Sequence, residues 1–219
     1  LRCLVGSEMC IRDRLTTHNL SNVGLDPMLL RQLQPALSAE NRSLTVSVWN
    51  DEEIIQLRAG FHDTVYGLAV DVGTTTLAGH LCDLRTGEVL ATASRMNPQV
   101  PYGEDLMSRV SYAMMHEDGT ERMHKAIIEG LNGLIDDACG EAKVPSSDVV
   151  EIVIVANTTM HHLILGVHPI ELGGAPFSLV THDAVDMKTR DLGLNLAPGA
   201  ILHIPPNEAC LLYTSPSPR

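Results

Sequence analysis

Apolar and polar residues follow one another over one stretch of this chain in a way that predicts short strands joined by tight turns. Residues 68–72 are an apolar run with Asp71 near its end, and residues 77–84 form a second apolar run. A turn at 85–87 leads into a third segment of strand character at 88–94. Because strands joined by tight turns pair antiparallel, these segments are expected to form a three-stranded antiparallel meander.

The spacing of apolar residues then changes to the helical period, which predicts two helices separated near Asp118-Gly119. The apolar positions of the first are Leu106, Met107, Val110 and Met114, and those of the second are Met123, Ile127, Leu131, Leu134, Ile135 and Ala138. Residues 149–155 are apolar and rich in β-branched side chains, as expected for a central strand covered on both faces. A short helix at 160–165 and a strand at 200–204 follow.

This order of elements, a meander followed by helices and a buried strand, is that of the ribonuclease-H-like α/β fold. The same fold forms one half of the proteins of the actin, sugar kinase and Hsp70 superfamily. Residues 63–209 are therefore predicted to be the first subdomain of such a protein, cut short at its C-terminal end.

Residues 15–62 are predicted to form a small α+β linker in front of this subdomain. Asp26-Pro27 is a helix-start signal, and Pro35 is expected to break the helix that follows. Residues 44–49 alternate as in a half-buried strand, which pairs with residues 52–58 across Asn50-Asp51.

Both ends of the chain resemble a translated sequencing adaptor. Residues 4–14 can be back-translated into an oligonucleotide whose reverse complement, read in another frame, encodes residues 210–219. Two ends of a natural protein have no reason to encode one oligonucleotide in opposite orientations. Residues 1–14 and 210–219 are therefore treated as adaptor artefact, and the remainder is expected to be an internal fragment of a longer protein.

The composition of that remainder narrows the function classes. It carries 11 basic and 25 acidic residues, which argues against nucleic acid as a partner. It has no run of about 18 apolar residues, so no membrane span is expected. Its cysteines, Cys82 and Cys139, lie in no CxxC motif, so neither a disulfide framework nor a structural zinc site is predicted. These features fit a reducing, cytoplasmic location.

The turn between the first two strands of the meander carries the strongest candidate chemistry. Gly73 lets the backbone approach a ligand closely, and Thr74, Thr75 and Thr76 offer hydroxyl and main-chain donors to phosphate oxygens. Asp71 needs a cation between its carboxylate and a phosphate, and Mg²⁺ binds through one or two carboxylates plus phosphates. The turn thus predicts a site for Mg·ATP or a similar nucleotide. The alternative is an ordinary polar hairpin turn.

A second candidate is the Asn157-Thr158-Thr159 segment, which follows the predicted central strand and precedes a helix. A helix N-terminus at a sheet edge favours an anion or an attacking water, so Asn157 and Thr158 are candidate catalytic residues. The alternative, held at even weight, is that one of them is only a helix cap.

Weaker candidates lie nearby. Asp105 and Arg109, four residues apart, are expected to form a surface ion pair, while Glu104-Asp105 lining a cleft is the alternative. His161-His162 point in different directions on a helix and are therefore poor joint ligands for one metal ion.

These motifs together resemble one family, the reductive activators of corrinoid proteins (RACo) and their ferredoxin-fused relatives, over about residues 40–209. The residues that carry the resemblance are 67–76 (GLAVDVGTTT), 97–99 (NPQ), 102–109 (YGEDLMSR), 157–163 (NTTMHHL) and 205–209 (PPNEA). It implies an ATPase that couples ATP hydrolysis to reduction of cob(II)alamin on a corrinoid methyl-transfer protein. By the same resemblance, residues 71–76 would be the first phosphate loop.

The resemblance also implies parts that this chain does not carry. The family has an N-terminal iron–sulfur domain, but Cys82 and Cys139 lie inside the ATPase portion. The second phosphate loop and the adenosine site would follow Ala209. The isolated chain is therefore expected neither to hydrolyse ATP at a useful rate nor to hold iron.

Two other functions remain open at this stage. A small-molecule kinase of the same superfamily would have a similar half-site, and a non-catalytic, actin-like assembly protein would bind nucleotide as a switch. The sequence leaves undecided which corrinoid protein is served, and a homodimer is compatible with it.

Overall fold

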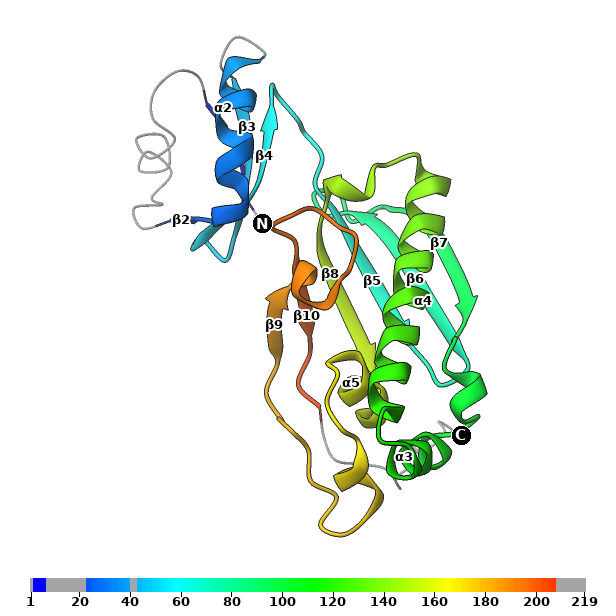
Figure 1. Ribbon diagram of the computed structural model, residues 1–219. Coiled ribbons are helices and arrows are strands. Elements are labelled where there is room, and N and C mark those ends of the chain that lie inside the picture. Colours follow the sequence, from blue (N-terminus) through cyan, green and yellow to red (C-terminus); the bar gives the residue numbers. More distant parts are fainter. Residues whose placement is uncertain (1, 7–22, 40–42, 208–219) are drawn as a thin grey trace, which may run out of the picture.

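A computed structural model describes residues 2–6, 23–39 and 43–207, which form two β-sheets with helices packed against them (Figure 1). The predictions for residues 7–22 and 208–219 concern segments outside this described part. The larger sheet has the strand order β7-β6-β5-β8-β10-β9. Its strands are β5 (Tyr66–Val72), β6 (Thr76–Asp83), β7 (Val89–Met96), β8 (Val149–Ala156), β9 (Val185–Lys188) and β10 (Ile201–Ile204). The chain is thus a mixed α/β protein, as predicted.

The predicted meander is confirmed. β5 pairs antiparallel with β6, and β6 pairs antiparallel with β7. β8 then joins β5 from the other side in parallel, with Val72 beside Ala156 in the register, and β10 continues in parallel. Since β5 and β8 run in the same direction, the segments that follow them emerge at one edge of the sheet.

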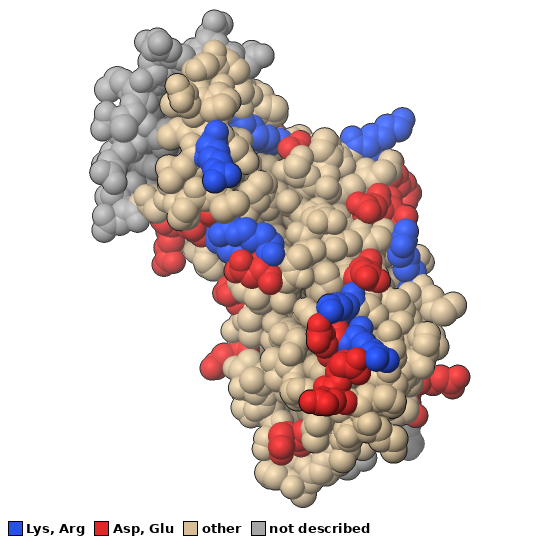
Figure 2. Space-filling model, in the orientation of Figure 1, with Lys and Arg blue, Asp and Glu red and all other residues tan. Residues whose placement is uncertain are grey.

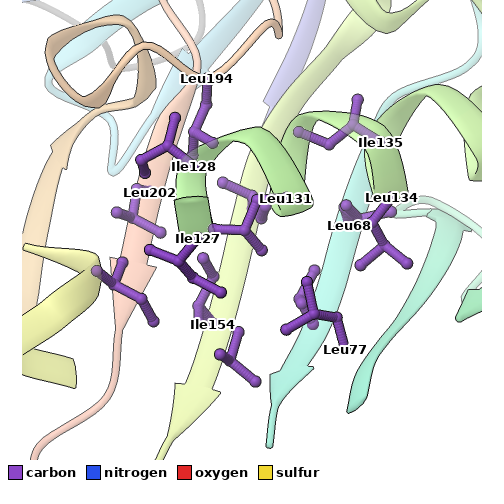
Figure 3. Close-up of a cluster of buried hydrophobic side chains, with 14 of the residues drawn as sticks. Leu68, Leu77, Ile127, Ile128, Leu131, Leu134, Ile135, Ile154, Leu194 and Leu202 are labelled. Atoms are coloured by element: carbon purple, nitrogen blue, oxygen red, sulfur yellow. The ribbon is translucent and has the colours of Figure 1, made fainter. Parts of the chain in front are cut away.

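One face of this sheet is covered by the long helix α4 (Gly119–Ala142), which crosses β5 and β6 in Figure 1. The apolar stripe predicted for this helix is confirmed, because all six of its positions are at most 1% exposed. They pack on alternate residues of the strands, including Leu68, Leu77 and Ile154 (Figure 3). Burial of this apolar surface is the main stabilising contribution of the unit.

The opposite face of the sheet is more open, so the prediction that β8 is covered on both faces is wrong in part. Ile152 and Ile154 are fully buried on the α4 side, but Val155 is 48% exposed on the other side. A shallow apolar hollow on that side is lined by residues of β5, β6 and β8 that include Ala69, Cys82 and Val153. The β-branched run of β8 therefore reflects its central position and not complete coverage.

The first predicted helix is α3 (Leu106–Met115), but its buried face differs from the predicted stripe. Met107 and Met114 are 47% and 63% exposed. Val110 is buried as predicted, and the other buried positions are Arg109 and Ala113. α3 packs beside α4 and against η5, a short 3₁₀ helix at Ile170–Gly173.

The linker forms a separate sheet of strand order β1-β3-β4-β2. Its elements are β1 (Arg2–Gly6), β2 (Gly24–Leu25), η1 (Pro27–Leu29), α2 (Leu30–Ser38), β3 (Leu44–Trp49) and β4 (Glu53–Ala59). The predicted hairpin is confirmed, with Asn50 and Asp51 at positive φ in its turn. β1 pairs with β3 through main-chain groups that any sequence offers, so this pairing does not test the adaptor interpretation of residues 1–14.

Two details of the linker differ from the predictions. Pro35 lies inside α2, which continues to Ser38, so the expected break is absent in this helix. Proline removes only one hydrogen bond of the helix, and none of the residues of α2 is fully buried. Thr45 and Ser47 are about as buried as Val46 and Val48. β3 is thus buried on both faces, because α2 covers one side and the middle of the chain covers the other.

The remaining elements connect the sheets to the site. They are η3 (Val100–Tyr102), η4 (Ser146–Asp148), α5 (Thr158–Ile164) and η6 (Thr189–Leu192). β9 and η6 were not predicted, because they are short and belong to a region rich in polar residues. Within the described ranges, no helix is long and apolar enough to cross a membrane. Figure 2 shows Lys and Arg interspersed with Asp and Glu on the face that it presents.

Candidate functional site

The turn between β5 and β6 lies at the edge of the sheet where β5 and β8 both end. Leu68, Val70 and Val72 point into the core, so Asp71 points to the opposite, open face, and its side chain is exposed. Gly73 follows β5 as Asn157 follows β8, and these strands are register neighbours. The structure therefore brings the two segments singled out in the sequence to one edge.

The carbonyl groups of three successive residues in this turn are held by donors from other elements. Asn97 donates its Nδ2 to the Gly73 carbonyl at 2.8 Å and its backbone N–H to the Thr75 carbonyl at 2.7 Å. The Thr74 carbonyl accepts a hydrogen bond from Arg109. Asn97 directly follows β7, and Arg109 belongs to α3.

The amide N–H groups of the same three peptide units point the other way. In a trans peptide the C=O and N–H bonds are antiparallel, so the N–H groups of Thr74, Thr75 and Thr76 point away from the donors Asn97 and Arg109 that hold the preceding carbonyls. Within the described residues these three N–H groups have no acceptor. Thr75 and Thr76 are exposed and Thr74 is partly exposed, so a ligand in solvent could reach them.

Three neighbouring outward N–H groups form a concave set of donors suited to an anion. Asp71 belongs to the end of the strand that leads into the same turn and would repel a bare phosphate, but its carboxylate could hold a Mg²⁺ ion that also binds phosphate oxygens. Among the residues described, no group of three or more His, Cys, Asp or Glu side chains could hold a metal ion by itself. The donors of the turn are suited to a Mg²⁺–phosphate ligand.

Arg109 is a buried residue, and the expected surface ion pair with Asp105 is absent. Asp105 instead caps α3, accepting from the Ser108 N–H at 2.8 Å. The Arg109 guanidinium is fully buried and donates to the Gly103 carbonyl at 2.9 Å and to Gln99 Oε1 at 3.1 Å. Burial lowers the pKa of Arg109 to about 10, so the side chain is still charged at neutral pH.

Asn157 caps α5, accepting from the Met160 N–H through its Oδ1 at 3.0 Å. This is the simpler of the two alternatives considered for that residue. Thr158 is only 3% exposed, so its side chain does not reach the solvent at the sheet edge. A role for either residue toward an attacking water stays a prediction.

His161 and His162 are buried on α5, and their surroundings favour the neutral form of each imidazole ring. His162 Nδ1 lies 2.8 Å from the Thr158 carbonyl, which requires it to donate, and Nε2 accepts from the Val180 N–H at 3.2 Å. Neither ring nitrogen of His161 has a partner among the described residues. Burial lowers the pKa of both rings, and His162 lowers that of His161 further.

This arrangement predicts a loss of stability in mild acid. Because the folded-state pKa values lie below the ordinary 6.5, the unfolded chain binds more protons than the folded chain once the pH falls below 6.5. Each histidine should then remove about 1.4 kcal/mol of unfolding free energy per pH unit until its folded pKa is reached. Urea unfolding at pH 7, 6 and 5 measures this slope.

A substitution can test whether the buried histidines His161 and His162 cause this pH dependence of the unfolding free energy. His161→Leu is expected to make the unfolding free energy less dependent on pH between 6.5 and 5 than it is in the parent chain. An unchanged slope in His161→Leu would contradict this account.

Sequence reasoning missed the two residues that shape the turn, Asn97 and Arg109. Arg109 lies three residues after Leu106 and four before Ala113, so helical spacing alone places it on the inner face of α3. That signal was available, but an arginine is so rarely buried that the surface interpretation took precedence. Nothing local indicates that Asn97 reaches back to Gly73.

Comparisons with known proteins find similar sequences and a similar solved structure over most of this chain. Residues 66–212 match the family described as the RACo middle region, and residues 10–64 match the RACo linker region. The chain is 35% identical over 142 residues to the corrinoid activation enzyme RamQ of Eubacterium limosum, a match that covers 64% of this chain and 24% of RamQ.

A solved structure, a reductive activator for a corrinoid, iron-sulfur protein, is similar with a TM-score of 0.80 and 26% sequence identity. That match covers 94% of this chain and 35% of the solved chain. The chain therefore spans about a quarter of the length of the curated relative and about a third of the solved one.

Proposed function

Since this chain belongs to the RACo family, whose linker and middle regions it contains, we propose that it is part of an ATP-dependent reductive activator of corrinoid proteins. The full-length protein would restore the cob(II)alamin of a corrinoid methyl-transfer protein to Co(I) by transfer of one electron. Of the relatives named above, one is described as a corrinoid activation enzyme and the other as a reductive activator for a corrinoid, iron-sulfur protein.

The observation that carries the nucleotide part of this proposal is the turn after β5. The N–H groups of Thr74, Thr75 and Thr76 have no acceptor among the described residues, and the exposed carboxylate of Asp71 belongs to the end of the strand that leads into the same turn. In the proposal, Gly73 and the three threonines bind a phosphate chain, and Asp71 holds Mg²⁺. Bound Mg·ATP would supply free energy through hydrolysis, while the chain positions and neutralises the phosphates.

The sheet supports the proposed fold family. The first strand of the meander, β5, pairs in parallel with β8, and β8 pairs in parallel with β10. This arrangement is the one expected of a ribonuclease-H-like subdomain of the actin, sugar kinase and Hsp70 superfamily. In this proposal residues 63–209 form one wall of the nucleotide cleft, and the opposing wall lies elsewhere in the full-length protein.

The remaining parts of the proposal concern partners. The electron would come from an iron–sulfur domain of the full-length protein, and the corrinoid protein would be the macromolecular partner. The proposal also places the protein in the cytoplasm and gives it neither nucleic acid nor a membrane as a partner. Asn157 and Thr158, at the neighbouring strand end, would lie near the attacking water after the second half of the cleft closes, with Thr158 acting through its main chain because its side chain is buried.

Asp71→Ala in the full-length protein is the test of this function. Loss of the carboxylate leaves the cation between the turn and the phosphates without its protein ligand, so ATP-dependent reduction of cob(II)alamin should fall by at least about 100-fold. The reduction is followed by the visible absorption of the corrinoid, and the iron–sulfur absorption should stay unchanged.

Asp136→Ala is the matched control, because Asp136 is also exposed but lies on α4, across the sheet from Asp71. It should reduce the corrinoid as fast as the parent protein. If the protein with Asp71→Ala shows normal ATP-dependent activation of the corrinoid protein, the proposed role of the turn in binding nucleotide is wrong.

A further inference from the structure

We propose that Arg109 is a positioning residue for the phosphate ligand, because its buried guanidinium holds the turn in the conformation that presents the three N–H groups. This inference rests on the proposed function of the turn, and it assigns a role to the 102–109 segment (YGEDLMSR). Arg109 would not touch the ligand, since it lies on the inner side of the turn and is fully buried.

The contacts of Arg109 explain how it can fix the conformation of the turn. The side chain donates to three main-chain or side-chain oxygens from separate segments, those of Thr74, Gln99 and Gly103. A planar guanidinium with several fixed donors can satisfy such a set at once, whereas an ammonium is a single point charge. Gln99 is itself fixed, because it donates to the Met123 carbonyl of α4 at 2.8 Å.

The orientation of the turn follows from these contacts. If the Thr74 carbonyl were released, its peptide unit could rotate and the Thr75 N–H would no longer point outward. The usual alternative for a four-residue turn is a bond from the Thr76 N–H to the Gly73 carbonyl, which would remove one donor from the ligand. In the described structure that carbonyl is held by Asn97 instead.

Arg109 also connects the turn to the second candidate segment. Its Nη1 lies 2.8 Å from the sulfur of Met160, which follows directly after the cap residues of α5. Arg109 thereby contacts both the turn after β5 and helix α5, so it helps to set their relative position.

The charge of Arg109 supports the same role. Within the described part of the chain no carboxylate forms an ion pair with Arg109, and although the charge of Asp105 raises its pKa, burial lowers it more. A phosphate bound at the outward N–H groups would bring negative charge to the other side of the same peptide units. The unpaired charge of Arg109 thus favours the anion that the turn is shaped to bind.

The test measures binding of magnesium tripolyphosphate to the ¹⁵N-labelled 219-residue chain through the amide resonances of Thr74, Thr75 and Thr76. Arg109→Lys keeps the charge but cannot reach all three oxygens. The matched control is Arg58→Lys, because Arg58 is also largely buried and donates to a backbone carbonyl, that of Thr64, but belongs to β4. Urea unfolding of each variant measures how much of any effect is loss of stability.

Arg109→Lys should weaken binding by about tenfold or more, as expected when a charge-assisted positioning bond is lost, while Arg58→Lys, even if equally destabilised, should bind as the parent chain does. Equal affinity of the parent chain and folded Arg109→Lys would overturn the role of Arg109 and leave the phosphate loop intact. Absence of any shift at Thr74, Thr75 and Thr76 in the parent chain would instead overturn the phosphate loop itself.

A measurement on the unmodified chain covers the case in which Arg109→Lys does not fold. The Nε–H resonance of Arg109 should shift during the titration with the same dissociation constant as the Thr75 amide, because the guanidinium and the amide belong to one bonded unit. If the Thr75 amide shifts while the Arg109 resonance does not move, the proposed coupling is wrong.

Discussion

Gly199→Ala is expected to lower the free energy of unfolding by about 3 kcal/mol or more. Gly199 is buried where the loop before β10 packs on the linker, and a Cβ at this position would lie 2.9 Å from the carbonyl carbon of Ile55 and closer still to its oxygen. The obstacle is backbone in the middle of β4, which cannot move without disturbing the linker sheet. Urea unfolding followed by circular dichroism measures the loss.

Gly133→Ala is the matched control on α4. Its Cβ would also meet a neighbour, Arg95, with Cζ at 2.7 Å, but that neighbour is the end of a flexible surface side chain. The arginine can move away, and alanine favours the helix by about 1 kcal/mol over glycine. A loss for Gly199→Ala no larger than that for Gly133→Ala would show that the linker does not pack on the loop as described.

The size of the first effect reflects how the linker is attached. Ile55 of β4 shares one buried cluster with Val65, Val150 and Ile201 of the middle region. Gln56, Arg58 and Ser47 add polar contacts on the same face of the linker, so this face is not a free surface. The linker and the middle region are therefore expected to unfold together.

Asp26→Asn is expected to cost about 3 kcal/mol at pH 7. Asp26 is fully buried at the start of η1, where its Oδ2 lies 2.6 Å from Arg190 Nη1 and 3.1 Å from Lys188 Nζ. Asparagine has nearly the same shape and can still accept from the Met28 N–H, so the change removes mainly the charge. Two cations, one of them still paired with Glu53, would then face each other across a neutral amide.

The pH dependence gives this prediction a second readout. Burial by itself would raise the pKa of Asp26, but hydrogen bonds from Arg190, Met28 and Lys188 hold it below its ordinary 3.8. A depressed folded pKa contributes stability that is present above the unfolded pKa and is lost as the pH falls through the folded pKa. The difference between the parent chain and Asp26→Asn should therefore persist at pH 7 and shrink below about pH 4.

Asp118→Asn is the control for loss of an ion pair as such. Asp118 lies 2.7 Å from Arg122, but both side chains are about half exposed. Water screens such a pair, so the substitution should leave the unfolding free energy unchanged within error. Equal stability of Asp26→Asn and Asp118→Asn at pH 7 would mean that the buried network does not hold the linker in place.

Features that depend on neighbouring residues were predictable. The stripe from Met123 to Ala138 repeats with the helical period, and it is the buried face of α4. The meander follows from three apolar runs and two short turns, and Asp26 caps a helix as its type and the following proline indicate. The edge at which Asp71 and Asn157 meet also follows, because it requires only that their strands run parallel.

Features that depend on distant partners were not predictable. Arg109 is buried only because three oxygens from 74, 99 and 103 converge on it, and no local pattern encodes that convergence. Thr45 and Ser47 are buried because the middle region covers the second face of β3, and β9 exists because β10 offers it an edge.

The turn after β5 shows the same division within one site. Its groups, a carboxylate, a glycine and three threonines at the end of a strand, can be read from the local sequence. The direction of its main-chain donors depends on the folded chain, because Asn97 and Arg109 from other elements set it. Peptide orientation is a consequence of which carbonyls find partners, and those partners are brought together only by folding.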